Sequence, residues 1–142
     1  MSEFYTVVTR DDLVSLLQSK GFQAERVSIG EGREGLRSAA NGFTFHIAPG
    51  NGESGSFRDF TYFANFRLDG VSLNVLCEKW NSARRFGRLH AREGLLNFEM
   101  DVLLAGGVSH DYLVFTLELW NHLLLELMNF LREETQALTK AA

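Results

Sequence analysis

Hydrophobic residues along this chain switch several times between a spacing of three or four, typical of helices, and the strict alternation typical of strands. The first helical stretch is predicted over Arg10–Lys20. Thr9 can cap its first turn, and Gly21 suits the left-handed conformation that often ends a helix. The chain therefore opens with a short amphipathic helix whose leucines face a core.

Alternating segments follow this helix and are separated by turns. Strands are expected over residues 22–29, 36–40, 43–48 and 57–68, with a strong two-residue hairpin signal at Asn41-Gly42. Residues 30–35 and 49–56 are rich in glycine and are predicted to be surface loops. A phosphate-binding function for the first of these loops is disfavoured, because it contains two acidic residues and no Lys-Ser pair follows it.

Helical spacing returns over Val71–Arg84 and gives way to a second hairpin with a turn at Glu93-Gly94. This turn predicts the cross-strand pairs Arg92 with Leu95, Ala91 with Leu96, His90 with Asn97, Leu89 with Phe98, and Arg88 with Glu99. Apolar residues then share one face and polar residues the other, as a correct register requires. Arg88 and Glu99 are therefore expected to form an ion pair on a solvated face.

The last helix is predicted to begin at the capping residue Ser109 and to end at about Thr135. Its apolar stripe is wider than the single face that a surface helix needs, because it includes the side chains of Tyr112, Phe115, Leu119, Leu123 and Phe130. One interpretation is that the sheet of the same chain covers the whole stripe. The other is that one flank of the helix binds a second subunit or another partner.

The order of elements predicts an α+β fold with a mainly antiparallel sheet of five to six strands covered by helices. This order is α-β-β-β-(β)-α-β-β-α, with one strand in parentheses because the strand at residues 36–40 is weakly signalled. The length of 142 residues fits one domain over residues 1–142, with a core at about 9–135 and a frayed tail at 136–142.

Charge and composition exclude several classes of protein. A formal net charge of −4 argues against nucleic-acid binding, which needs a basic surface. Charged and amide residues interrupt the apolar stretch from Tyr112 to Leu131, which therefore does not predict a membrane span, and the N-terminus lacks the pattern of a signal peptide. A cytoplasmic protein is expected.

Candidate catalytic groups do not converge in the sequence. Ser109-His110-Asp111 contains the residue types of a catalytic triad, but such residues meet through the fold and do not stand in a row. Glu99 and Asp101 share a strand face, where Arg88 should keep both ionised. The single cysteine, Cys77, is expected to be a small buried apolar residue. No catalytic residue, metal ligand or cofactor is predicted.

The one basic concentration in this acidic chain consists of Arg84, Arg85, Arg88 and Arg92, beginning at the end of the second helix, and Asn81 lies close to it. These side chains could bind an anionic ligand or a partner. They could equally serve the fold, because cations suit a helix C-terminus and Arg88 has a carboxylate opposite it in the predicted register. The pattern leaves both interpretations open.

Several segments with uncommon residues keep a characteristic spacing: Trp80-Asn81, Arg85-Phe86-Gly87-Arg88, Leu96 through Asp101, Leu104-Ala105-Gly106-Gly107-Val108-Ser109 and Leu119-Trp120. In these segments the chain resembles the YbjN family of bacterial sensory transduction regulators. Glu78 is a departure, because relatives often carry Asn at that position. The resemblance implies a type III secretion chaperone-like fold, often homodimeric, in which Trp80 and Trp120 are core aromatics.

The resemblance carries over no catalytic or ligand-binding residue. It implies a non-catalytic regulatory or chaperone-like module that binds a protein partner, with Tyr112, Phe115, Leu119, Leu123 and Phe130 as a candidate dimer or partner surface. The alternative is a sensor of a small anionic ligand that uses Asn81 and the Arg84, Arg85 and Arg88 cluster.

Overall fold

A six-stranded antiparallel sheet forms the centre of the computed structural model, which describes the backbone of residues 4–141 and the side chains of residues 4–135. The strands lie in the order β2-β3-β4-β7-β9-β8. They are β2 (Glu25–Gly30), β3 (Arg33–Ala40), β4 (Phe43–Pro49), β7 (Asp59–Phe66), β9 (Leu95–Leu103) and β8 (Arg88–Arg92). The α+β class and the mainly antiparallel sheet are thereby confirmed.

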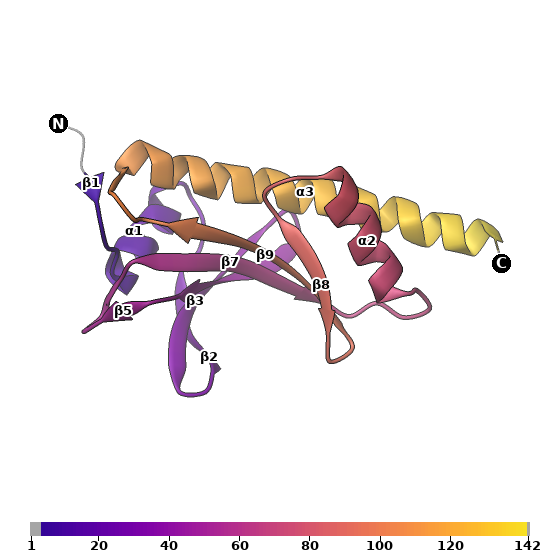
Figure 1. Cartoon of the computed structure of the whole chain (residues 1–142), viewed down its shortest axis with the longest axis horizontal. Helices are drawn as coiled ribbons and strands as arrows, with labels where there is room; N and C mark the ends of the chain where they lie inside the picture. The colour runs from indigo at the N-terminus through magenta and orange to yellow at the C-terminus, as the bar shows by residue number, and fades with distance from the viewer. Residues whose placement is uncertain (1–3, 142) are drawn as a thin grey trace.

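Three helices accompany this sheet in the described part of the chain: α1 (Arg10–Ser19), α2 (Leu73–Ala83) and α3 (His110–Ala141). Figure 1 shows α3 running along one side of the sheet. Helix α1 lies beside the first half of α3, and α2 lies beside the second half. The chain leaves β7 through α2, forms the edge strand β8, and returns as β9 between β8 and β7. The α2 crossover thus places the second hairpin at one side of the sheet.

Two short strand pairs lie outside the main sheet. One joins β1 (Phe4–Tyr5) to β10 (Val108–Ser109), and the other joins β5 (Gly52–Glu53) to β6 (Ser56–Phe57). The segment predicted as a loop over residues 49–56 therefore contains strand pairing. The tail predicted to fray over residues 136–142 is helical as far as Ala141, and residue 142 lies outside the described residues.

The predicted loop over residues 30–35 is also shorter than expected. Only Glu31 and Gly32 separate β2 from β3, and both have positive φ angles, 52° and 71°. Gly35 lies within β3, where a Cβ would stand 2.6 Å from the carbonyl oxygen of Ile47 and 2.9 Å from Ile29 Cγ2. Glycine at this position allows a close approach of the backbone inside a strand. The prediction of a loop over residues 30–35, which rested on the glycine content, is therefore wrong for residues 33–35.

The predicted caps at the starts of α1 and α3 are confirmed. The amide N–H of Asp12 donates to Thr9 Oγ1 at 3.1 Å, and the amide N–H of Thr9 donates to the Asp12 carboxylate at 2.9 Å. At the start of α3, the amide N–H of Tyr112 donates to Ser109 Oγ at 3.0 Å. These bonds satisfy backbone donors that an α-helix leaves unpaired in its first turn.

Both tryptophans are buried in the core between the sheet and the helices, as predicted. The indole of Trp120 stacks with the rings of Tyr62 and Phe98, at interplanar angles of 16° and 20°. Trp80 donates its indole N–H to the carbonyl oxygen of Gly87 at 3.0 Å. Cys77 packs against this core as predicted but is only partly buried, so it is more exposed than expected.

Candidate functional site

The β8–β9 hairpin has the register that its sequence predicts, from Arg92 opposite Leu95 to Arg88 opposite Glu99. Arg88 donates to Glu99 Oε2 at 2.6 Å and to Asp101 Oδ2 at 2.8 Å, which confirms the cross-strand ion pair. Burial opposes ionisation of Asp101, but hydrogen bonds from Arg88 and Thr61 outweigh it and hold the pKa of Asp101 below its ordinary value. The Asp101 carboxylate therefore stabilises the sheet as an anion.

Asn81 is occupied by the backbone of β8. Its Oδ1 accepts from the amide N–H of Leu89 at 2.9 Å, and its Nδ2 donates to the carbonyl oxygen of the same residue at 2.8 Å. The carboxamide thus pairs with the outer edge of β8 as a neighbouring strand would. In this conformation α2 protects the edge of the sheet.

The arginines of the predicted anion cluster point to different partners. The guanidinium of Arg84 lies over the rings of Trp80 and Phe130, at 4.6 and 5.1 Å from their centroids. Arg85 lies over the ring of Phe86 at 4.8 Å, and Arg88 binds its two carboxylates. These contacts agree with the structural interpretation of the cluster, and the anion site at Asn81, Arg84, Arg85 and Arg88 stays a prediction.

The wide apolar stripe of α3 is divided by α2. Phe130 and Leu123 are only 5% and 4% exposed, so their assignment to a partner surface is corrected. The physical reason is that Trp80 of α2 meets Phe130 edge to face, with ring centroids 5.4 Å apart, and Arg84 covers the same ring. This half of the stripe belongs to the core of the chain itself.

The other half of the stripe is open. Phe115 is 54% exposed and Tyr112 43% exposed, while Leu119 is partly buried beside them. Phe86, 62% exposed, completes the group, and these four side chains surround a hollow of about 130 Å³ that has Met100 and Val102 in its lining. We call Phe86, Tyr112, Phe115 and Leu119 the apolar patch.

Phe86 has a backbone conformation that its residue type rarely adopts. Its φ angle is +77°, and the amide N–H of Gly87 donates to the carbonyl oxygen of Arg85 at 3.0 Å, which makes Phe86 the centre of a classic γ-turn. Gly87 is required here, because a Cβ would lie 2.5 Å from the ring of Phe98. The sequence pattern predicts Phe86 as the start of the next strand and does not single it out, whereas the structure places it in the short connection between α2 and β8.

The strand beside the apolar patch has an open edge. β7 pairs with β9 as far as Leu103, whereas β8 pairs with it only from Leu95 to Glu99. Beyond Glu99, no strand in the described residues pairs with the outer edge of β9. An extended segment could therefore add to this edge, beside the exposed aromatic rings.

Among the described residues, no group of three or more His, Cys, Asp or Glu side chains could hold a metal ion. No helix in the same part of the chain combines the length and the apolar composition of a membrane span. Burial raises the pKa of the Cys77 thiol above its ordinary value, which disfavours the reactive thiolate.

Comparison with known proteins gives one match. A family model with the description "YbjN: Putative bacterial sensory transduction regulator" matches residues 9–133 of the chain. Nothing among the curated proteins or the solved structures matches it. The matched range includes α2, β8, β9 and the part of α3 that carries the apolar patch.

Proposed function

Because the chain belongs to the YbjN family of bacterial sensory transduction regulators, we propose that it is a non-catalytic, cytoplasmic module that acts by binding another protein. The apolar patch is the proposed contact surface. The observation that carries this proposal is the exposure of three aromatic side chains, Phe86, Tyr112 and Phe115, around one hollow. A cluster of exposed aromatic side chains on a soluble surface is typical of a protein-binding site.

The backbone of Phe86 supports the same function. A bulky residue at a positive φ angle strains the chain, and such strain concentrates at functional sites. Trp80 and the ring of Phe98 hold Gly87 directly behind the turn, so the Phe86 ring is presented outward by a rigid base. A preorganised aromatic ring loses little conformational freedom when a partner binds it.

The proposed partner is an extended segment with apolar side chains. It would pair with the open edge of β9 beyond Glu99 and insert side chains into the hollow between Phe86 and Phe115. This mode of binding resembles that of type III secretion chaperones, which hold extended client segments in hydrophobic grooves. The chaperone-like fold and a homodimer are parts of this proposal.

Affinity capture with two matched variants tests the proposal. Phe115→Ser removes an aromatic ring from the apolar patch, and Leu125→Ser removes an exposed apolar side chain, also from α3 but outside the patch. Loss of a central aromatic contact weakens protein complexes by about 2 kcal/mol or more. Quantitative proteomics should therefore show partners that the wild type and Leu125→Ser retain and Phe115→Ser loses.

The same variants decide whether the partner is a second copy of the chain. Light scattering at tens of micromolar should show whether the wild type is a dimer and whether Phe115→Ser alone makes it a monomer. A set of partners that is the same for all three proteins, together with one unchanged oligomeric state, would contradict the patch as the binding surface.

A further inference from the structure

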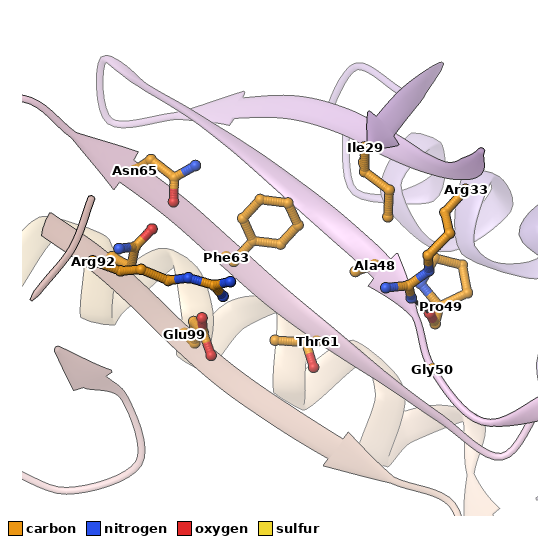
Figure 2. A pocket seen from close by; sticks show the side chains of 11 residues that line it. Ile29, Arg33, Ala48, Pro49, Gly50, Thr61, Phe63, Asn65, Arg92 and Glu99 are labelled. Carbon is orange, nitrogen blue, oxygen red and sulfur yellow. Dashed lines mark hydrogen bonds between the residues drawn. The ribbon is translucent and has the colours of Figure 1, made fainter. Parts of the chain in front are cut away.

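The sheet face opposite the helices carries a pocket of about 370 Å³ that is separate from the apolar patch. Figure 2 shows it between two walls. One wall comes from the β2–β3 hairpin with Ile29 and Arg33, and the other comes from β8 and β9 with Arg92 and Glu99. The pocket has the volume of a small-ligand site, since such sites enclose about 300–1,000 Å³.

The sheet topology brings these walls together. β2 and β3 lie at one side of the sheet and β9 and β8 at the other, with β4 and β7 between them as the floor. Both hairpins extend to the side away from the helices (Figure 1). Gly35 helps to shape the first wall, because its missing Cβ lets Ile29 fold over the face of the sheet.

The floor of the pocket has an apolar centre. Phe63 lines it, and the ring of Phe63 stacks on His46 with centroids 5.1 Å apart and planes 16° from parallel. Burial, assisted by the charge of Arg37, lowers the pKa of His46 and keeps its ring neutral at pH 7. The stacked pair therefore gives the floor a fixed aromatic surface without a charge of its own.

Two arginines approach the floor from opposite walls. In Figure 2 the guanidinium groups of Arg92 and Arg33 point toward each other across the pocket, with Phe63 and Thr61 between them. Arg33 uses one N–H to donate to the carbonyl oxygen of Pro49. The guanidinium group of Arg92 has no hydrogen bond or ion pair with any described residue, so its donors remain available for a ligand.

The carboxylate in the lining does not cancel this positive charge. Glu99 is already engaged, with Oε2 bound to Arg88 at 2.6 Å and Oε1 to His90 at 2.7 Å. Two guanidinium groups against one carboxylate leave one excess positive charge in the lining. Asn65, another lining residue, has a carboxamide without a partner among the described residues and can orient a polar group on the ligand.

We propose that this pocket binds a small anion that carries a flat ring. Its carboxylate or phosphate group pairs with Arg92, and its ring lies against Phe63 and Ile29. None of Asn81, Arg84, Arg85 and Arg88 lines this pocket, and the pocket adds the apolar surface of Phe63 and Ile29 to its arginines. It is independent of the proposed protein-binding function, because no residue of the apolar patch lines it.

Protein-observed NMR titration of the full chain tests this pocket with named probes. Adenosine monophosphate and benzoate combine a ring with an anion, while inorganic phosphate, acetate and adenosine each lack one of the two. Saturable shifts at Phe63, Asn65 and Asn97 are expected with at least one of the first two probes. The responding probe distinguishes phosphate from carboxylate. An absence of saturable shifts with both, or equal affinity for an anion without a ring, would overturn the proposal.

Two charge-matched variants locate the contact. Arg92→Gln removes the guanidinium at the pocket, and Arg132→Gln makes the same change on exposed α3. Because a charge-assisted hydrogen bond is strong, Arg92→Gln should weaken binding of the responding probe about tenfold or more. Arg132→Gln should leave the affinity unchanged. Equal affinity in both variants would overturn the assignment of the anion to Arg92.

Discussion

Two halves of one apolar stripe on α3 differ sharply in their exposure to solvent. Leu123 and Phe130 are buried in the core, Phe130 against Trp80 of α2. Tyr112 and Phe115 face the same side of the helix about two to five turns earlier and are open to solvent. Helical periodicity gives the two halves the same pattern. The difference lies in the length of α2, which is 11 residues against 32 for α3 and can cover only part of the stripe.

A residue of the covered half should contribute to stability, and a residue of the open half should contribute to binding. The uncovered length of α3 lies beside the γ-turn of Phe86 and the open edge of β9, so three separate features meet at the apolar patch.

The largest expected effect concerns stability in the covered half. Phe130→Ala removes a ring that is 5% exposed and packed against Trp80, and should reduce the free energy of unfolding by about 3–5 kcal/mol. Phe115→Ala, on the same helix, should change it by less than about 1 kcal/mol. Urea unfolding followed by tryptophan fluorescence measures both. Equal losses in the two variants would remove the distinction between the halves.

A smaller change in the free energy of unfolding, in the stabilising direction, is expected at Phe86. Phe86→Gly relieves a positive φ angle at which non-glycine residues are strained, and should leave stability unchanged or raise it by up to about 1 kcal/mol. The same variant should lose the partners that the wild type captures. Phe86→Leu is the matched control, since it keeps a side chain in the strained conformation and should show no gain in thermal unfolding. A marked destabilisation by Phe86→Gly would show that the ring serves the fold.

The smallest expected effect is a change in the free energy of unfolding at low pH. It concerns Asp101, which lines the hollow of the apolar patch and accepts a hydrogen bond from Arg88. The pKa of Asp101 is lower in the folded chain than its ordinary value of 3.8, so this contact stabilises the fold above that pH and is lost as the pH falls through the lower folded value. Asp101→Asn should therefore cost less than about 1 kcal/mol at pH 7, because the pair is well exposed, and less still near pH 3.

Urea unfolding at a series of pH values tests this last prediction. Asp69→Asn, at an exposed aspartate without a hydrogen bond to any described residue, is the control and should leave the pH dependence unchanged. A difference between Asp101→Asn and the wild type that grows toward pH 3 would contradict the assigned direction of the pKa shift.

Local sequence predicted much of the fold because its signals were redundant. In the β8–β9 hairpin, turn type and the alternation of both faces specify the same register, which the structure has from Arg92 to Glu99. Caps at Thr9 and Ser109 were predictable for the same reason, since one side chain decides each helix start. Glycines were less informative, because Gly35 stands in a strand for close packing and not in a loop.

The sites depend on long-range packing, which local patterns do not contain. The stripe on α3 was recognised, but which half α2 would cover depends on where the crossover from β7 to β8 places that helix. Phe86 was not singled out by the sequence pattern, and Arg33 and Arg92 are brought to one pocket only by the strand order of the sheet. Asn81 and the three arginines near it are close in sequence but bind different groups in space.

Site-specific photocrosslinking in living cells tests the central claim most directly, because it reports which protein surface a partner touches. A photoreactive phenylalanine analogue replaces Phe115 in one protein and Leu125 in another, about 15 Å apart along the axis of α3. The account predicts a discrete crosslinked protein, or a crosslinked dimer, from position 115 and none from position 125. Equal crosslinking at the two positions, or crosslinks from position 125 alone, would contradict the apolar patch as the binding surface.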